Sequence, residues 1–403
     1  MLKLESRGTI LLVLSVAQFL ALTLWFNATA IVPQLTSHWN LSEFDIDLLS
    51  IAVTGGFVVG CLTSAFLNLP DVIKTRNFFI VSVFAGGLFN SMASFAHTFS
   101  IVIPFRFLTG MFLAGVYPSG MKLAATWFRE ERGFAIGMII AALTAGSGLP
   151  YLFNLTGIPN WRIVLNVSTG LAVLSGLMIW VFIDEGPYAA AAARFNLRNI
   201  GQIMDNKALK LANYGYFGHM WELYAMWVWI PLFLRESYIC VYPTSDPKFF
   251  FSAGTFLVFL SGAIATCVGG KLADTYGRTN FNSIMLAASG VSSLLIGFFF
   301  DKPYVMLGVA ILWGMTVIAD SPQYSSMVTE LAERVYVGTA LTLQTAIGFL
   351  LTIVSIQIVP MFGRIVGLQN CFTVLTPGPL IGIICLYRLK KHPDSEKIAQ
   401  GKR

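Results

Sequence analysis

Apolar windows long enough to cross a lipid bilayer recur from one end of this chain to the other. Each window is bounded by charged residues, proline or asparagine, and about 20 apolar residues in a helix span the hydrocarbon layer. Because a bilayer offers no partner for backbone polar groups, such runs cross it as helices. We therefore predict an all-α integral membrane protein with twelve transmembrane helices. The predicted spans are 9–33, 46–68, 77–97, 101–123, 133–156, 161–183, 209–234, 249–270, 281–300, 304–327, 337–360 and 368–387.

The composition agrees with a lipid environment. Of the 403 residues, 56% are hydrophobic and only 11% are charged, whereas soluble domains carry about 25% charged residues. The net charge of +6 is spread over short clusters between apolar runs, so it does not indicate a nucleic-acid partner. The five cysteines form no CxxC pair and share no metal-ligand spacing with the four histidines. No disulfide framework, metal site or cofactor is expected.

The basic residues predict how the chain is oriented. Placing the amino terminus in the cytoplasm puts most loop cations on the cytoplasmic side, as the positive-inside rule requires. Those cations are Lys74, Arg76, Arg129, Arg132, Arg194, Arg198, Lys207, Lys210, Lys271, Arg278, Arg334 and the basic tail. The opposite face keeps Arg162, Arg235, Lys248, Lys302 and Arg364. We predict a multi-pass plasma-membrane protein, with a bacterial inner membrane favoured and both termini cytoplasmic.

The longest internal polar segment, residues 184–208, separates six spans from six. We predict an amino-terminal six-helix bundle at 1–183, a cytoplasmic central loop at 184–208 and a second six-helix bundle at 209–388. The remaining segment, 389–403, is polar and basic, and we expect it to be a disordered cytoplasmic tail.

The two halves echo each other in sequence. GVYPSGMKLAATW at 115–127 and ADSPQYSSMVTEL at 319–331 both place a proline before the end of a fourth-type helix. Gly-Phe-Ala at 133–135 and Gly-Thr-Ala at 338–340 then open the next span. Duplication at half-length is a known architecture of secondary transporters, which bind their substrate between the repeats.

A charged, glycine-containing loop, GGKLADTYGRTN at 269–280, joins the eighth and ninth spans. Gly270 and Gly277 allow tight turning and close helix approach. Asp274 can lie near a helix amino terminus, where a carboxylate is stabilised, and Arg278 can pair across the loop. Such a loop can latch two helices in one conformational state and release them in another.

This loop resembles the G-x-x-x-D-x-x-G-R signature of the major facilitator superfamily. The first-half loop, GCLTSAFLNLPDVIKTR at 60–76, keeps Asp71 but has lost the spacing. RFLTGMFLAG at 106–115 and WFREERGFAIG at 127–137 are similar to the family's fourth-helix motif and to its loop between helices four and five. The resemblance implies two pseudo-symmetric six-helix bundles, alternating access between them, and a coupling role for Arg106.

Ionisable residues inside the predicted spans are candidate functional positions, because a charge near the bilayer centre costs at least about 2.5–3.5 kcal/mol. Glu222 lies near the middle of the seventh span, and His219 shares its helical face. This pair can take up and release a proton, or it can be a fixed pair that holds helices together. Asp320 and Arg106 are further candidates for proton coupling. The alternatives are bonding to backbone groups freed by Pro322 for Asp320, and outward snorkelling for Arg106.

Aromatic and amide side chains supply candidate substrate contacts. Trp221 and Tyr224 flank Glu222 on the seventh span, and aromatic faces beside a carboxylate suit an organic cation, a zwitterion or a planar ring. Trp25 and Asn27 in the first span and Gln344 in the eleventh complete the set. Core packing and interhelical hydrogen bonds are the alternative roles for these residues.

These observations predict a secondary active transporter of a small organic solute, working as a monomer by alternating access and coupled to protons in the uptake direction. Efflux of drugs or metabolites by antiport and transport of a small anion are alternatives. A non-transporting membrane sensor or scaffold is the alternative class. The sequence contains no catalytic constellation and no phosphate-cradling loop, so neither an enzyme nor ATP-driven transport is expected.

Overall fold

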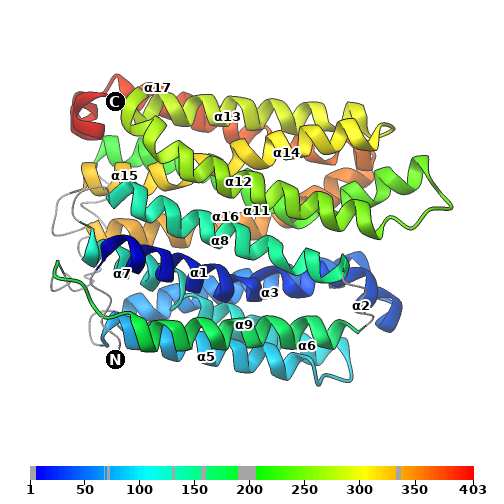
Figure 1. The fold of residues 1–403 in the computed structure, drawn as a ribbon. Coiled ribbons are helices and arrows are strands. Elements are labelled where there is room, and N and C mark those ends of the chain that lie inside the picture. The colour runs from blue at the N-terminus through cyan, green and yellow to red at the C-terminus, as the bar shows by residue number, and fades with distance from the viewer. Residues whose placement is uncertain are drawn as a thin grey trace. The chain divides into compact units, whose positions relative to one another are not determined.

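The computed structural model describes residues 6–67, 69, 73–128, 132–155, 160–188, 206–332 and 337–403, and the regular structure in these ranges is helical throughout. The chain divides into two compact units, Met1–Ala192 and Ala193–Arg403. We call them unit 1 and unit 2 and describe each by itself (Figure 1).

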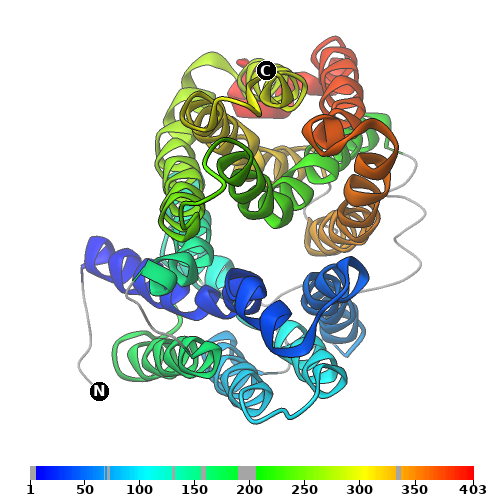
Figure 2. The same ribbon diagram turned by 90° about the vertical axis from the view of Figure 1, so that its right-hand side faces the viewer.

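Unit 1 is built from helices that run along one another within the unit (Figure 1). They are α1 (Arg7–Ala30), α2 (Val32–Trp39), α3 (Glu43–Phe66), α5 (Thr75–Ala93), α6 (Phe99–Leu113), α7 (Tyr117–Trp127), α8 (Arg132–Leu155) and α9 (Trp161–Phe182). Unit 2 has a related order of helices, and Figure 2 views these helices end-on. They are α11 (Lys207–Val241), α12 (Lys248–Tyr276), α13 (Arg278–Leu295), η1 (Ile296–Phe299), α14 (Pro303–Ala319), α15 (Ser321–Leu331), α16 (Val337–Val366), η2 (Leu368–Leu375), α17 (Pro377–Lys390) and η3 (Pro393–Gly401).

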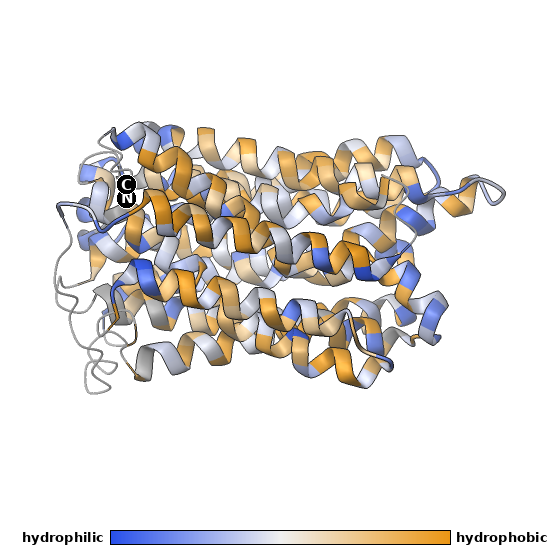
Figure 3. Cartoon of the chain, turned by 60° about the horizontal axis from the view of Figure 1, so that its bottom comes forward, coloured by the Kyte–Doolittle hydropathy of each residue, from blue (hydrophilic) through white to orange (hydrophobic). Residues whose placement is uncertain are grey.

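Ten helical segments in the described ranges are long and apolar enough to cross a membrane, which makes the chain a multi-pass membrane protein. Hydrophilic residues gather near the helix ends, whereas apolar residues line long stretches between them (Figure 3). The two other predicted spans, 77–97 and 209–234, coincide with α5 and α11, which are not among those ten. In α11 the apolar run is interrupted by buried polar and aromatic side chains, including His219 and Glu222.

Both units break their fourth predicted span at the same relative position. In unit 1 the chain leaves α6 after Leu113 and starts α7 with Pro118 in its first turn. In unit 2 it leaves α14 at Asp320 and starts α15 with Pro322 in its first turn. Proline is favoured in the first turn of a helix, where its missing N–H is not needed. The proline echo in the sequence thus corresponds to two matching helix breaks.

Small residues bring helices into backbone contact in each unit. A β-carbon on Gly110 of α6 would lie 2.0 Å from the carbonyl oxygen of Val53 on α3, and one on Gly314 of α14 would lie 2.5 Å from that of Val258 on α12. Only glycine permits such an approach, which is a common way for membrane helices to associate. The α3–α6 and α12–α14 contacts fix the position of α6 and α14, which carry site residues.

Candidate functional site

Unit 1 buries one arginine among neutral oxygen atoms. Arg106 of α6 is 1% exposed, and its Nη1 donates to Oδ1 of Asn27 and to Oδ1 of Asn90, each at 2.9 Å. Its Nη2 donates to the backbone oxygens of Leu24 at 3.1 Å and Trp25 at 2.8 Å. Among the described residues, no carboxylate forms an ion pair with Arg106. The guanidinium thus points into the unit, and outward snorkelling is not what the structure shows.

Unit 2 buries a carboxylate on the corresponding helices. Glu222 of α11 is fully buried. Its Oε2 accepts a hydrogen bond from Ser289 Oγ of α13, and its Oε1 accepts one from Trp313 Nε1 of α14, both at 2.8 Å. The indole can only donate, but a hydroxyl can donate or accept. Ser289 can therefore hydrogen-bond Glu222 in either protonation state. It donates to the carboxylate form, and with the bond reversed it accepts from the neutral acid.

His219 pairs with an acid from the helix break, and not with Glu222. Its Nδ1 lies 2.9 Å from Oδ1 of Asp320, and both side chains are 1% exposed. Tyr216 and Tyr324 enclose the imidazole, with ring centroids 5.9 and 5.5 Å away. The other ring nitrogen, Nε2, has no hydrogen-bond partner among the described residues.

The expected His219–Glu222 pair is therefore replaced by two separate polar centres. The two residues lie on one face of α11 as their spacing predicts, yet each meets a different neighbour because α14 ends and turns at Asp320. The helix break supplies the acid for His219, while the preceding turns of α14 supply Trp313 for Glu222.

The predicted substrate contacts are divided among several packing positions. Trp221 donates from Nε1 to the carbonyl oxygen of Val374, at 3.2 Å, and lies against Gly378 at the start of α17. Tyr224 packs edge-on to Trp227 and against Phe349 of α16, at centroid distances of 5.4 and 5.0 Å. The contacts with Val374, Gly378 and Phe349 join α11 to its neighbours, so the geometry favours packing for Trp221 and Tyr224.

The remaining two predicted contacts have different surroundings. Gln344 of α16 is buried, and its Nε2 donates to Oδ1 of Asn213 on α11 at 3.0 Å. Trp25 lies T-shaped against Phe57 of α3, and its backbone oxygen accepts from Arg106. Of the five neutral residues predicted to contact substrate, Trp25 and Asn27 accept hydrogen bonds from the buried Arg106.

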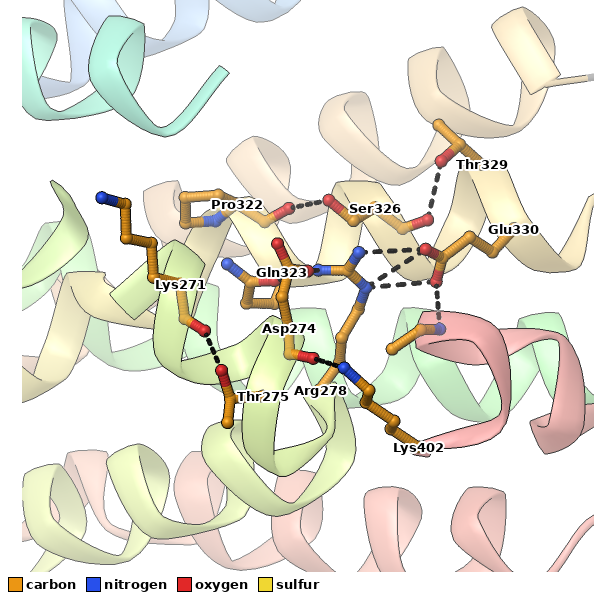
Figure 4. Close-up of polar contacts among 11 residues, drawn as sticks. Lys271, Asp274, Thr275, Arg278, Pro322, Gln323, Ser326, Thr329, Glu330 and Lys402 are labelled. Carbon is orange, nitrogen blue, oxygen red and sulfur yellow. Dashed lines mark hydrogen bonds and ion pairs between the residues drawn. The ribbon is translucent and has the colours of Figure 1, made fainter. Parts of the chain in front are cut away.

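Arg278, the first residue of α13, is the centre of a polar cluster at the junction of α12 and α13 (Figure 4). Arg278 pairs with Asp274 at 3.1 Å and with Glu330 of α15 at 3.0 Å, and its Nη1 also donates to Gln323. Gly277 joins the two helices with φ +90°, a backbone conformation suited to glycine. Gly270 is buried within α12. The loop therefore holds α12, α13 and α15 together through one guanidinium.

Two expectations about this region need correction. Asp274 lies in the last turns of α12, where it pairs with Arg278, and not at a helix amino terminus. The tail is ordered and not disordered, because η3 returns to the loop: the N–H of Ala399 donates to Glu330, and Nζ of Lys402 donates to the backbone oxygen of Asp274. Asp71, the predicted counterpart in the first half, lies outside the described residues.

Sequence reasoning missed several residues that complete these centres. Asn90 was detectable as an isolated amide in an apolar span, by the argument that selected Asn27. Glu330 also carried a signal, since it is the penultimate residue of the duplicated ADSPQYSSMVTEL segment. Ser289 and Trp313 carried none, because serine and tryptophan are ordinary residues in membrane helices.

Comparison with known families decides the fold family. The family model described as the Major Facilitator Superfamily matches residues 14–239 and 247–403. The chain belongs to the Major Facilitator Superfamily. This confirms the resemblance seen in the sequence motifs, and it assigns the chain to a family of transporters and not to one of enzymes. The two-bundle fold expected of this superfamily agrees with the all-helical structure.

Three relatives show how distant the matched members are. A Cupriavidus necator protein named a probable sulfoacetate transporter is 20% identical over 298 residues, covering 69% of this chain and 67% of the relative. An Arabidopsis thaliana protein named for glycerol-3-phosphate transport is 24% identical over 188 residues, covering 43% of this chain and 32% of the relative. The D-galactonate transporter of Escherichia coli is 25% identical over 120 residues, covering 29% and 28%. The match thus spans about a third or less of two of these relatives.

Proposed function

We propose that this superfamily member is a secondary active transporter that moves a small organic anion by alternating access, coupled to protons and in the uptake direction. The observation that carries the proposal is the burial of opposite charges in the two units, Arg106 in unit 1 and Glu222 in unit 2, each held by neutral hydrogen-bond partners. A charge inside a membrane helix without an opposite partner is costly and marks a functional position.

Arg106 supports an anionic substrate. A guanidinium recognises carboxylate, sulfonate and phosphate groups through charge and hydrogen bonds. Three relatives are named for sulfoacetate, glycerol-3-phosphate and D-galactonate, which are all small organic anions. This narrows the cargo from any small organic solute, and it argues against the organic cation that the aromatic residues beside Glu222 suggested.

Glu222 and the His219–Asp320 pair support proton coupling. Ser289 can stabilise Glu222 with or without its proton, as its hydroxyl both donates and accepts. A carboxyl group that is held in both forms can carry a proton between the two sides of a membrane as access alternates. His219 adds a second titratable group on the same helix, with an open Nε2.

The test uses the purified full-length protein in proteoliposomes. D-galactonate, sulfoacetate and glycerol-3-phosphate are offered under an inward proton gradient, with D-galactose and glycerol as uncharged counterparts. We expect gradient-driven accumulation of at least one anion and of neither counterpart. Glu222→Gln should abolish accumulation while leaving exchange of that anion across the membrane. Glu236→Gln, on the same helix but half-exposed beside Arg235, is the matched control and should behave as wild type.

Two results would refute parts of this proposal. Accumulation of D-galactose or glycerol alone would refute the anionic substrate. Equal gradient-driven accumulation by wild type and Glu222→Gln would refute the coupling role of Glu222, even if an anion is transported.

A further inference from the structure

The amides around Arg106 have a defined orientation. Asn90 of α5 donates from Nδ2 to the backbone oxygen of Leu165, at 2.8 Å, and to Oγ1 of Thr169, at 3.0 Å. A backbone carbonyl can only accept, so this edge of Asn90 must be its NH₂ group. The other edge, Oδ1, therefore faces Arg106.

The orientation of Asn90 in turn fixes that of Asn27. Nδ2 of Asn27 donates to Oδ1 of Asn90 at 2.8 Å, which leaves Oδ1 of Asn27 to accept from Arg106 at 2.9 Å. Two side-chain oxygens and two backbone oxygens thus receive the four N–H groups of the guanidinium head. The fifth donor, Nε, is buried and has no hydrogen-bond partner among the described residues.

The network satisfies four of the five N–H donors of Arg106 but not its charge. All four acceptors are neutral, so a full positive charge stays buried in unit 1. An unpaired buried ion carries a penalty of several kcal/mol that an opposite charge can offset. Aspartate has nearly the shape of asparagine, so an aspartate at position 27 or 90 would fill the same space and cancel that charge internally.

We infer that Asn27 and Asn90 are specificity-determining residues: they hold the Arg106 guanidinium in place with neutral oxygens, so that the anionic group of the substrate is what neutralises it. The inference rests on the proposed function and deepens it, since it says why an anion is selected. Asn27 and Asn90 act through Arg106 as positioning residues, and the buried Nε–H, which has no hydrogen-bond partner among the described residues, is the donor that we assign to the substrate.

Asn27→Asp is the first test, because position 27 loses only the bond from its Nδ2 to Asn90. Binding of D-galactonate, sulfoacetate and glycerol-3-phosphate is measured on the purified protein, together with the melting temperature without ligand. We expect the dissociation constant of the bound anion to rise at least about tenfold, because the new carboxylate pairs with Arg106. The melting temperature should stay equal or rise. A purely structural role for Asn27 predicts the opposite, a lower melting temperature with unchanged affinity.

Asn166→Asp is the matched control. Asn166 of α9 is exposed and bonds Ser91 and Ser94, away from Arg106, so it receives the same chemical change without reaching the guanidinium. We expect its anion affinity to match the wild type. Asn90→Asp is the second variant. It loses the bond to Leu165, which can lower its stability, and we expect it to weaken anion binding as well.

The outcomes separate this inference from the proposed function. If wild type binds an anion, and Asn27→Asp and Asn90→Asp bind it equally well, the inference is wrong and the proposed function stands. If wild type binds only the uncharged counterparts, both are wrong. If Asn27→Asp loses anion affinity while wild-type transport does not depend on a proton gradient, the inference holds and proton coupling fails.

Discussion

Units 1 and 2 use the same helices of each repeat to bury opposite charges. In unit 1, α1, α5 and α6 contribute Asn27, Asn90 and Arg106. In unit 2, the counterparts α11, α13 and α14 contribute Glu222, Ser289 and Trp313. The charged residue sits on the fourth span in one unit and on the first span in the other. Equivalent scaffold positions therefore do not carry equivalent residues, and the duplicated fold allows each unit its own chemistry.

The units also differ in how their titratable groups are partnered. Arg106 has four neutral acceptors, whereas His219 in unit 2 has an acid, Asp320, within 2.9 Å. A guanidinium without a carboxylate partner suits binding of an anion, and an imidazole in contact with an acid suits proton transfer. Under the proposed function, unit 1 would recognise the charge of the substrate and unit 2 would move the proton.

Removing Arg106 should have the largest effect on anion uptake. Arg106→Gln leaves no cation for an anionic substrate, and we expect anion uptake in proteoliposomes to fall at least about a hundredfold. Arg106→Lys keeps the charge but not the four hydrogen bonds of the guanidinium, so its uptake should lie between those of wild type and Arg106→Gln. Arg162→Gln, a partly exposed cation of the same unit, is the control. If Arg106→Gln takes up the anion at the wild-type rate, Arg106 has no role in substrate recognition.

Neutralising Asp320 should have the next largest effect. Asp320→Asn removes the acid beside His219, so we expect gradient-driven accumulation to fall about tenfold, with a shallower dependence on external pH. The measurement is uptake of the transported anion across a series of pH values. Asp301→Asn, at an exposed turn, is the control. An unchanged pH profile would make the His219–Asp320 contact structural, and unit 2 would then couple through Glu222 alone.

Unit 2 also contains the polar cluster centred on Arg278. A β-carbon on Gly277 would lie 1.8 Å from the carbonyl oxygen of Arg403, in addition to the positive φ. Gly277→Ala should therefore destabilise the protein by about 1–3 kcal/mol, measured as a lower melting temperature. Gly308→Ala is the control, since nothing lies within 4 Å of its new β-carbon. Equal melting temperatures for wild type and Gly277→Ala would contradict a tight contact between tail and loop.

The smallest effect is expected at Trp221. Trp221→Phe removes the hydrogen bond to Val374 and should cost about 1 kcal/mol of stability, with anion affinity unchanged. Thermal unfolding and anion binding, measured on the same sample, separate the two effects. Trp180→Phe serves as control, because Trp180 of α9 is 59% exposed. A loss of anion affinity without a loss of stability would instead indicate that Trp221 contacts the substrate, as its sequence position beside Glu222 suggests.

Most of the fold was predictable because span length and apolarity are local properties. The predicted starts of the spans at 161, 249 and 304 lie within one residue of the starts of the helices α9, α12 and α14. The exceptions have local reasons too. Asp320 and Pro322 break one predicted span into two helices, and α11 runs seven residues beyond its predicted end at 234.

The site was predicted in part. The buried positions of Arg106, His219, Glu222 and Asp320 followed from the cost of charge in a membrane, but their partners did not. The spacing of His219 and Glu222 suggested one pair, whereas Asp320 comes from a helix about a hundred residues further along the chain. The tail was misjudged for a similar reason, since its polar composition gave no sign of the contacts with Glu330 and Asp274.

The sequence by itself determined that the chain crosses a membrane several times, that its two halves echo each other, and which ionisable residues lie within the predicted spans. These follow from hydropathy and periodicity, which are properties of single segments. Only the tertiary structure decided that Arg106 faces neutral oxygens while His219 faces an acid. Side chains within hydrogen-bond distance come from helices far apart in sequence, and their approach depends on glycine contacts and helix breaks that act only once the helices pack.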